Sequence, residues 1–423
     1  MSRMQKIKMP EQLRICMLAK SFPVGRRSED LGFLWPIARE LTKQGHKIVV
    51  LSWAHPNNKF SDTYDGVEVH YLATTKEPFS EKEAQARSFY RFRELHSQSP
   101  FHLVHSIDSL GLNIALKKKQ FKVPVLYDVQ ATRMSELFAI MAMTEESIRS
   151  YITTGLLVGF YYLKNFLMSD RKVIATADAM FVTSPRQKMT LERYYYFPEY
   201  RTYSVPYGIE LGDLSTRPIS EEMRAKFGIP TGAKVIITES DYTEKDALKN
   251  ILKAFEKAVI KKPHSHLVVI GNGPHFKEIE YEMLSLALVK KVTMLTSYSS
   301  DDLQDLIAIC DVYLSISSKT SGFEPLLLEA MSQKKIVIGS EVTPISSIIS
   351  DGIDGFLVRP ADIGGIAELL IKICSDLVSQ AQIGDLARQK VLEIFDTRKM
   401  VKETLNAYFK TLKNTGYYFR TDA

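Results

Sequence analysis

Short runs of apolar, β-rich residues alternate with longer amphipathic segments along the whole chain, and this alternation constrains the fold more than any other feature. The first half holds such runs at residues 13–19, 47–52, 67–72, 102–106, 124–129 and 179–184. The second half repeats the pattern at residues 234–239, 266–271, 291–295, 311–316, 335–340 and 355–358. Most runs are apolar throughout rather than alternating, which is typical of parallel strands covered by helices on both faces. We therefore predict an α/β protein with two Rossmann-like domains.

The length of 423 residues suits two domains of about 200 residues each. A turn-rich stretch, PYGIELGDLSTRP (206–218), opens no strand and separates the two sets of runs. We predict domains over residues 1–206 and 207–395, with a C-terminal helix over 396–423 that packs back on the first domain. Such sheets bind ligands at the carboxyl ends of their strands, so we expect the two parallel sheets to face an interdomain cleft that holds the ligand.

Bulk composition excludes several classes of function. The net charge of +6 is a mild excess, without the clustered basic stripe that nucleic-acid binding usually needs. The three cysteines, Cys16, Cys310 and Cys374, are far apart and predict neither a disulfide framework nor a zinc site. The first residues, MSRMQKIKMPEQ, lack the apolar stretch of a signal peptide, and no apolar run reaches the ~20 residues of a membrane span. We expect a cytoplasmic protein with no nucleic-acid partner.

Several motifs follow one another in a characteristic order over residues 13–410. They include FHLVHS (101–106), VPVLYDV (123–129), HLVVIGNGP (266–274), CDVYLSIS (310–317) and SGFEPLLLEAMSQKKIVIGS (321–340). In order, spacing and coverage, the chain resembles the family-4 (group 1) retaining glycosyltransferases of GT-B fold. The resemblance implies sugar transfer from a nucleotide-sugar donor, bound by the second domain, to a hydroxyl acceptor on the side of the first. The acceptor would be a glycan, a lipid-linked molecule or a small molecule, and neither a metal nor another cofactor is implied.

The motif SGFEPLLLEAM contributes candidate donor-binding residues. Pro325 suits the first turn of a helix, and Gly322 lets backbone N–H groups approach hydroxyl or phosphate oxygens. The resemblance implies that the loop 321–324, with Gly322 and Phe323, holds the donor sugar and that Glu329 binds the ribose hydroxyls. The alternative is a capped core helix whose glutamates lie in solvent.

Two further segments resemble donor-binding elements. Gly25 lies in VGRR (24–27), a turn after the first strand where backbone amides can meet a diphosphate or a sugar, although a plain loop fits these four residues equally well. Lys245 begins the helix after the first strand of the second domain, and the resemblance implies that it neutralises the donor diphosphate. Ordinary surface charge is the alternative for Lys245.

The chain departs from the family at four positions. The family has two glutamates eight positions apart, and only the second, Glu329, is present; Ser321 stands at the first. Gln130 replaces a histidine, Ser240 an arginine and Ser347 a glutamate. Gln130 can still bind a sugar hydroxyl but cannot carry a positive charge.

We take Gln130, Ser321 and Glu324 as the candidate catalytic positions. On a helix Glu324 would lie about 140° around the axis from Glu329, so it needs an altered loop entry to reach the same site. Losing one preorganised donor typically costs ~100- to 1,000-fold in rate. The departures therefore leave an alternative function, a catalytically degenerate glycosyltransferase-like protein that binds a sugar, a glycan or a partner glycosyltransferase.

Residues 136–168 are unusually apolar and aromatic, and KKKQFK (117–122) adds positive charge. These features are compatible with a lipid-linked acceptor, the inner face of a membrane or a protein partner. The alternative is a long pair of core helices.

Overall fold

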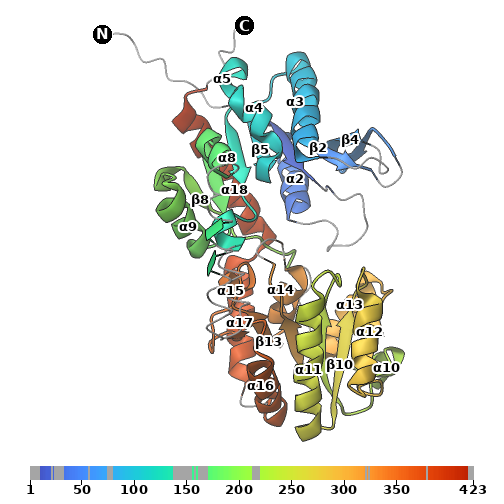
Figure 1. Ribbon diagram of the computed structural model, residues 1–423. Coiled ribbons are helices and arrows are strands. Elements are labelled where there is room, and N and C mark those ends of the chain that lie inside the picture. Colours follow the sequence, from blue (N-terminus) through green and yellow to red (C-terminus); the bar gives the residue numbers. More distant parts are fainter. Residues whose placement is uncertain are drawn as a thin grey trace. The chain divides into compact units, whose positions relative to one another are not determined.

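The computed structural model describes residues 10–20, 22, 33–55, 58–73, 80–136, 155–156, 159–160, 170–211, 220–319, 322, 324–377 and 380–417 (Figure 1). The chain divides into two compact units. Unit 1 comprises residues 1–134, 162–207 and 397–423, and unit 2 comprises residues 135–161 and 208–396. Each unit is built around a sheet of its own.

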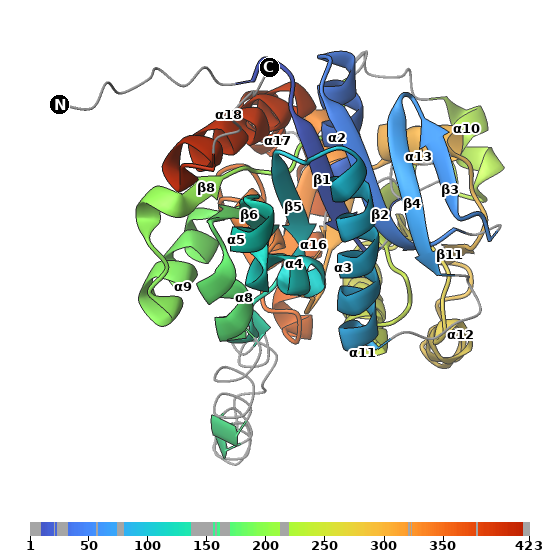
Figure 2. The ribbon, with the colours of Figure 1, turned by 90° about the horizontal axis from the view of Figure 1, so that it is seen from above.

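Unit 1 contains an eight-stranded sheet in the order β3-β4-β2-β1-β5-β6-β7-β8 (Figure 2). Its strands are β1 (Arg14–Ala19), β2 (Lys47–Ala54), β3 (Ser61–Tyr64), β4 (Val67–Ala73), β5 (Leu103–Ile107), β6 (Val125–Asp128), β7 (Ala179–Val182) and β8 (Thr202–Ser204). All neighbours pair in parallel except β3, which runs antiparallel to β4. Chain order reverses between β1 and β5, which makes their carboxyl ends the topological switch point of this unit.

Helices cover this sheet on both faces. They are α2 (Leu34–Lys43), α3 (Glu81–Gln98), α4 (Leu112–Leu116), α5 (Lys118–Phe121), α8 (Arg171–Thr176), α9 (Pro185–Tyr195) and α18 (Thr397–Thr415), with single 3₁₀ turns at Asp108–Gly111 and Glu199–Arg201. On one face, apolar side chains of α3, α4 and α8 pack with Val104, Val125 and Tyr127 of the sheet. The C-terminal helix α18 contacts α2, and its Tyr408 is fully buried against His105 of β5.

Unit 2 contains a six-stranded, all-parallel sheet in the order β11-β10-β9-β12-β13-β14. Its strands are β9 (Lys234–Glu239), β10 (Ser265–Ile270), β11 (Val292–Leu295), β12 (Val312–Ser315), β13 (Ile336–Ser340) and β14 (Phe356–Val358). Relative to the chain this is the Rossmann order 3-2-1-4-5-6, and its switch point lies between β9 and β12.

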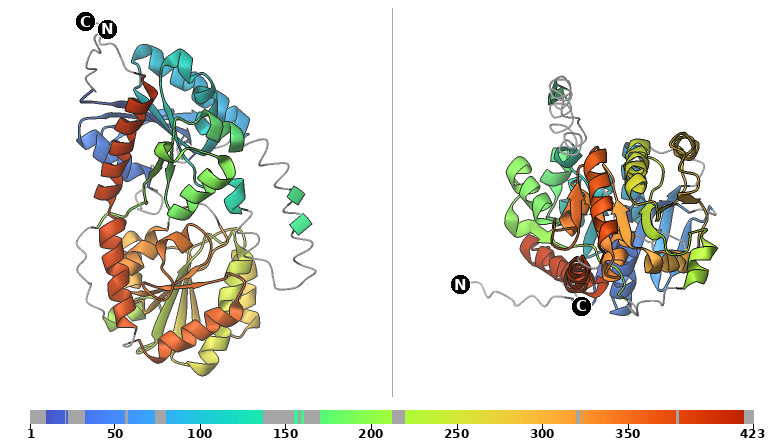
Figure 3. Two further views of the ribbon diagram at one scale, coloured as in Figure 1. Left: turned by 90° about the vertical axis from the view of Figure 1, so that its left-hand side faces the viewer. Right: turned by 90° about the horizontal axis from the view of Figure 1, so that it is seen from below.

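The helices of unit 2 also form two layers (Figure 3). They are α10 (Glu221–Lys226), α11 (Lys245–Lys261), α12 (Phe276–Ser285), α13 (Ser300–Ile309), α14 (Pro325–Ser332), α15 (Ile345–Ile348), α16 (Ile363–Ser375) and α17 (Ala381–Ile394). Alternate residues of the strands feed two separate apolar clusters: Ile236 packs with α11 and α16, whereas Ile237 packs with α13, α14 and α17. Burial on both faces accounts for the continuously apolar strand runs of the sequence.

The prediction of two α/β domains with parallel sheets is confirmed, and a strand overlaps every one of the predicted runs. Two strands were not predicted, β3 and β8. The sequence of β3, SDTY, is polar because it lies at a sheet edge, where side chains remain partly in solvent. Gly25, Ser321 and Phe323 lie outside the described residues, as does nearly all of the segment 136–168. Within the described part of the chain, no helix combines the length and apolarity needed to cross a membrane.

Candidate functional site

The carboxyl ends of β9 and β12 bring two polar loops together at the switch point of unit 2. The loop after β9 holds residues 240–244, and the loop after β12 holds residues 316–319. Glu244 joins them: it accepts hydrogen bonds from the Ser317 hydroxyl over 2.5 Å and from the backbone N–H of Ser318 over 2.8 Å. Lys319 closes the other side, with its Nζ 2.5 Å from Oδ2 of Asp241.

Glycines after β10 support the loop that follows β9. A Cβ added to Gly271 would collide with the backbone oxygen of Ser240, and one added to Gly273 with that of Asp241. Gly271 also has a positive φ of +122°, which side-chain-bearing residues rarely adopt. The glycines of GNGP therefore let the segment after β10 pack directly against the backbone of the loop after β9, which holds that loop in position.

Lys245 is the first residue of α11 and lies beside this loop. Its Nζ is 3.3 Å from Oε2 of Glu278 on α12, and the Lys245 side chain is 42% exposed. Hydrogen bonds from His275 and Lys245 lower the pKa of the Glu278 carboxyl. An ion pair this exposed contributes little to stability, so Lys245 can exchange Glu278 for an anionic ligand at small cost.

Glu324 immediately precedes α14, which begins at Pro325 as predicted. Burial raises the pKa of the Glu324 carboxyl to about 7, although a hydrogen bond from the Ser315 hydroxyl (3.4 Å) acts in the opposite direction. The backbone of Glu324 is not helical, with φ −112° and ψ 67°. The separation of 140° around a helix therefore does not apply to this residue, which faces the end of β12 instead.

The other donor-site candidates of unit 2 lie on the same motif. Glu329 is half-buried in the second turn of α14, and Gly322 is exposed with a φ of +135°. No described heavy atom lies within 4 Å of a Cβ placed at Gly322, so the backbone there is open to a ligand. The structure thus brings Lys245, Gly322, Glu324 and Glu329 to the region around β9 and β12.

Gln130 belongs to unit 1, where it follows β6. Its Nε2 donates to Oδ1 of Asp128 over 3.0 Å and also contacts the hydroxyl of Tyr207. A carboxylate oxygen can only accept, so the nitrogen of the amide must face Asp128 and the carbonyl oxygen is left for other partners. The ring of Tyr207 stacks on Phe33 with centroids 3.7 Å apart, which fixes the hydroxyl in turn.

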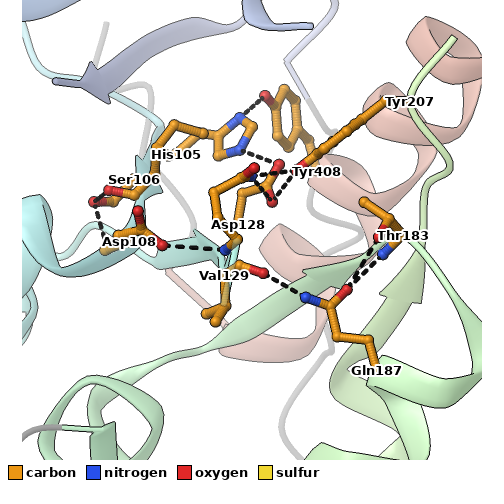
Figure 4. A network of polar contacts seen from close by, with 11 residues as sticks. His105, Ser106, Asp108, Asp128, Val129, Thr183, Gln187, Tyr207 and Tyr408 are labelled. Atoms are coloured by element: carbon orange, nitrogen blue, oxygen red, sulfur yellow. Dashed lines mark hydrogen bonds and ion pairs between the residues drawn. The ribbon is translucent and has the colours of Figure 1, made fainter. Parts of the chain in front are cut away.

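Asp108 was not predicted from the sequence and lies at the switch point of unit 1 (Figure 4). Its carboxylate accepts a hydrogen bond from the backbone N–H of Gln130 over 3.1 Å. Burial raises the pKa of Asp108 to about 6, against the lowering effect of that hydrogen bond. Its φ of +49° is uncommon for a residue other than glycine. In the sequence, the motif HSID, in which an acidic residue directly follows a buried strand, is the pattern that indicates Asp108 as a candidate.

His105 and Asp128 form a buried pair close to these residues (Figure 4). Nδ1 of His105 is 2.7 Å from the Tyr408 hydroxyl, and its Nε2 is 3.8 Å from Oδ2 of Asp128. The pair connects the C-terminal helix α18 to the carboxyl end of β6. Across the described residues, no group of three or more His, Cys, Asp and Glu side chains is arranged to hold a metal ion.

Comparison with known protein families identifies the family to which this chain belongs. Residues 219–390 match the family described as glycosyl transferases group 1, and residues 33–208 match the glycosyl transferase 4-like domain. The chain belongs to the group 1 glycosyltransferases. The first match covers the unit 2 sheet and the second covers the unit 1 sheet except for β1; residues 1–32, 209–218 and 391–423 lie outside both.

Individual relatives of this glycosyltransferase are distant. N-acetyl-α-D-glucosaminyl L-malate synthase of Bacillus anthracis is 28% identical over 193 residues, which cover 46% of this chain and 50% of the relative. The chain thus matches about half the length of that curated protein. Sucrose-phosphate synthase from Thermosynechococcus elongatus has a TM-score of 0.74 at 17% identity, covering 94% of this chain and 98% of its own. Anabaena HepE in complex with UDP and glucose has a TM-score of 0.68 at 16% identity, covering 93% and 99%. The fold is GT-B.

The glycosyltransferase keeps polar but uncharged groups at two of its departures from the family. Ser240 accepts a hydrogen bond from the backbone N–H of Tyr242 over 3.0 Å, so its hydroxyl shapes the turn after β9. Ser347 lies in α15, and its buried hydroxyl has no hydrogen-bond partner among the described residues. Neither side chain supplies the charge that the family carries at that position.

Proposed function

We propose that this glycosyltransferase moves a sugar from a nucleoside-diphosphate donor to a hydroxyl acceptor, with retention of the anomeric configuration. The observation that carries the proposal is the cluster of polar groups at the β9–β12 switch point, where Rossmann sheets bind nucleotides. The match of both domains to glycosyltransferase families supports the same reaction class.

Each candidate residue of unit 2 has a role in this proposal. Lys245 binds the diphosphate after leaving Glu278, and Glu329 binds the ribose hydroxyls of the donor. The loop 321–324, with the open backbone of Gly322, receives the sugar. Binding the diphosphate by lysine and backbone dipoles stabilises the leaving group as its negative charge develops.

The chemical step breaks the bond between the anomeric carbon and the diphosphate oxygen, which leaves with the electron pair. A bond forms between the anomeric carbon and the acceptor oxygen, whose proton must depart. Glu324, with a pKa of about 7, holds and releases a proton near neutral pH, which suits it to this transfer. Gln130 accepts a hydrogen bond from a substrate hydroxyl through its carbonyl oxygen, because its nitrogen is held by Asp128.

Calorimetry with UDP, GDP and ADP, followed by assays of hydrolysis and transfer with the corresponding nucleotide sugars, tests the proposal. UDP comes first because the structural neighbour HepE was solved with UDP and glucose. We expect one diphosphate to bind, Glu329→Gln to weaken it, and the exposed control Glu222→Gln to leave it unchanged. NMR of the product anomer tests retention. A folded protein that binds none of the three diphosphates contradicts the proposal.

A glycosyltransferase-like binding protein without turnover is the second candidate. It is favoured by the charge balance at the switch point, because Lys245 and Lys319 each form an ion pair with a carboxylate. Lys245 pairs with Glu278 and Lys319 pairs with Asp241. The same experiments separate the two candidates. Diphosphate binding without hydrolysis or transfer of any nucleotide sugar supports the binding protein, whereas turnover excludes it.

We further propose that residues 136–168 bind a lipid-linked acceptor or a membrane surface. This binding would place the protein on the inner face of a membrane. The apolar and aromatic composition of this segment supports the proposal. Flotation with vesicles of neutral and of anionic lipid tests it. Salt-sensitive binding to anionic vesicles is expected, and its absence contradicts the proposal.

A further inference from the structure

The switch point of unit 2 has no arginine in the loop after β9 but has a lysine in the loop after β12. Ser240 occupies the position where the family resemblance implies an arginine, so the loop after β9 offers no guanidinium to a diphosphate. Lys319 lies on the neighbouring loop after β12, and its Nζ is 2.5 Å from Oδ2 of Asp241, the residue that follows Ser240. The switch point therefore has a positive charge in the loop after β12 and none in the loop after β9.

The backbone that carries Lys319 is held in place from several directions. Glu244 accepts hydrogen bonds from the hydroxyls of both Ser317 and Ser318 and from the backbone N–H of Ser318. The backbone N–H of Lys319 donates to the Ser317 hydroxyl over 3.0 Å. The Lys319 side chain, in contrast, is 43% exposed and can turn to a new partner while its backbone stays fixed.

Asp241 is the partner that a ligand would have to replace. Although desolvation raises its pKa, the hydrogen bonds from Lys319 and Thr243 outweigh that effect and leave the pKa of Asp241 below its ordinary value. The side chain is ionised at neutral pH and 54% exposed. Exposed ion pairs contribute little free energy, so Lys319 is held to Asp241 only weakly.

We propose that Lys319 is a diphosphate-binding residue of this glycosyltransferase, which replaces the charge absent at Ser240, and that Asp241 competes with the ligand for it. The inference rests on the proposed nucleoside-diphosphate donor. In the free protein Lys319 pairs with Asp241. When the donor binds, the ammonium group of Lys319 moves from Asp241 to the diphosphate. The diphosphate carries more negative charge than Asp241 and therefore makes the stronger charge-assisted hydrogen bond.

A different role for the pair would be structural, with Lys319 and Asp241 tying the two loops together. The two roles predict opposite effects of substitution at Asp241. If the ion pair holds the two loops together, Lys319→Ala and Asp241→Asn both loosen the loops and both weaken ligand binding. If Asp241 competes, Lys319→Ala weakens binding and Asp241→Asn strengthens it.

Calorimetric titration of the full chain with UDP, GDP and ADP is the test. The nucleoside that corresponds to the diphosphate that binds serves as a control ligand without phosphates. We expect Lys319→Ala to raise the diphosphate Kd about 10- to 100-fold, because hydrogen bonds between charged groups contribute roughly 1.5–3 kcal/mol. Lys319→Arg should stay within about threefold of the wild type, because it keeps the charge. Asp241→Asn should lower the Kd about two- to fivefold, by the strength of the exposed pair it removes.

Lys226 provides the matched control. It lies on α10 with its side chain 48% exposed and pairs with Asp302 and Asp305, so Lys226→Ala removes an ion-paired lysine of similar exposure from elsewhere in unit 2. We expect it to leave the diphosphate Kd unchanged, and none of the variants should alter nucleoside binding. Circular dichroism establishes that each variant is folded.

The outcomes separate this inference from the proposed function. Diphosphate binding that is unchanged in Lys319→Ala, or weakened in Asp241→Asn as much as in Lys319→Ala, overturns the inference alone. A wild-type protein that binds none of the three diphosphates overturns the proposed function and the inference with it.

Discussion

The hydroxyl of Tyr207 donates a 2.6 Å hydrogen bond to Oδ1 of Asp128, and both groups are buried. The same oxygen accepts from Nε2 of Gln130, so two side-chain donors share one carboxylate oxygen. Tyr207 is the last residue of the middle segment of unit 1, residues 162–207. The residue that ends this segment thus also contacts the amide of Gln130.

Tyr207→Phe keeps the ring that stacks on Phe33 and removes only the hydroxyl. We expect a loss of about 1–3 kcal/mol in the free energy of unfolding, because a buried side-chain oxygen of Asp128 loses one of its hydrogen-bond donors. Urea unfolding measures the change. Tyr200, 69% exposed, supplies the control, and Tyr200→Phe should leave the midpoint where it is. Equal midpoints for the two variants would contradict the importance of this hydrogen bond.

Tyr408→Phe tests how α18 is held to unit 1. Its hydroxyl lies 2.7 Å from Nδ1 of His105 in a fully buried contact. Without it, His105 keeps a buried ring nitrogen with no hydrogen-bond partner, at a cost of about 1–3 kcal/mol. We expect faster amide hydrogen exchange in Thr397–Thr415 than in the wild type, measured by mass spectrometry. Exchange in α18 that stays at the wild-type rate would show that apolar packing alone holds the helix.

Gly273→Ala tests the close approach of the loops after β9 and β10. The added Cβ would collide with the backbone oxygen of Asp241, so the loops must separate and the free energy of unfolding should fall by about 1–3 kcal/mol. Gly364 is the matched control because its Cβ would make only ordinary contact with Asp362, the N-cap of α16. Gly364→Ala should raise stability by up to about 1 kcal/mol, the helix preference for alanine. Thermal unfolding of the two variants should therefore shift in opposite directions.

The sequence predicted the sheets better than the site. Runs such as KIVVLS are apolar because the strands are covered on both faces, so local pattern alone located them. The pairs Lys319–Asp241 and Tyr207–Asp128 were not predictable in the same way, because their partners lie 78 and 79 positions apart. They meet only through strand order, which places β9 beside β12 and puts β8 next but one to β6, and local pattern does not encode that order.

The predicted roles of Lys245 and Glu329 came from the family resemblance, and Glu324 became a candidate because Ser321 stands at the family's first glutamate; all three stay predictions. What the structure adds to them is physical environment. Glu324, which a helical projection places away from Glu329, lies in non-helical backbone at the end of β12 with a raised pKa. Burial of a carboxyl depends on the packing around it, which no spacing of residues in the sequence reports.

Glu324→Gln should remove a pH dependence of stability. Burial raises the pKa of Glu324 from its ordinary 4.5 to about 7, so between these values the folded protein binds a proton that the unfolded chain releases. The stability that this proton contributes is fully present below about pH 4.5 and is lost as the pH rises through about 7. The loss amounts to at most about 3 kcal/mol, since one pKa unit corresponds to 1.36 kcal/mol. The amide introduced by the substitution stays neutral, so urea unfolding of Glu324→Gln between about pH 4.5 and 8 should lack this part of the decline. Glu222→Gln, on the exposed face of α10, should keep the wild-type slope. Parallel stability curves for wild type and Glu324→Gln would show that the Glu324 carboxyl is ionised throughout this range and unsuited to exchanging a proton with substrate.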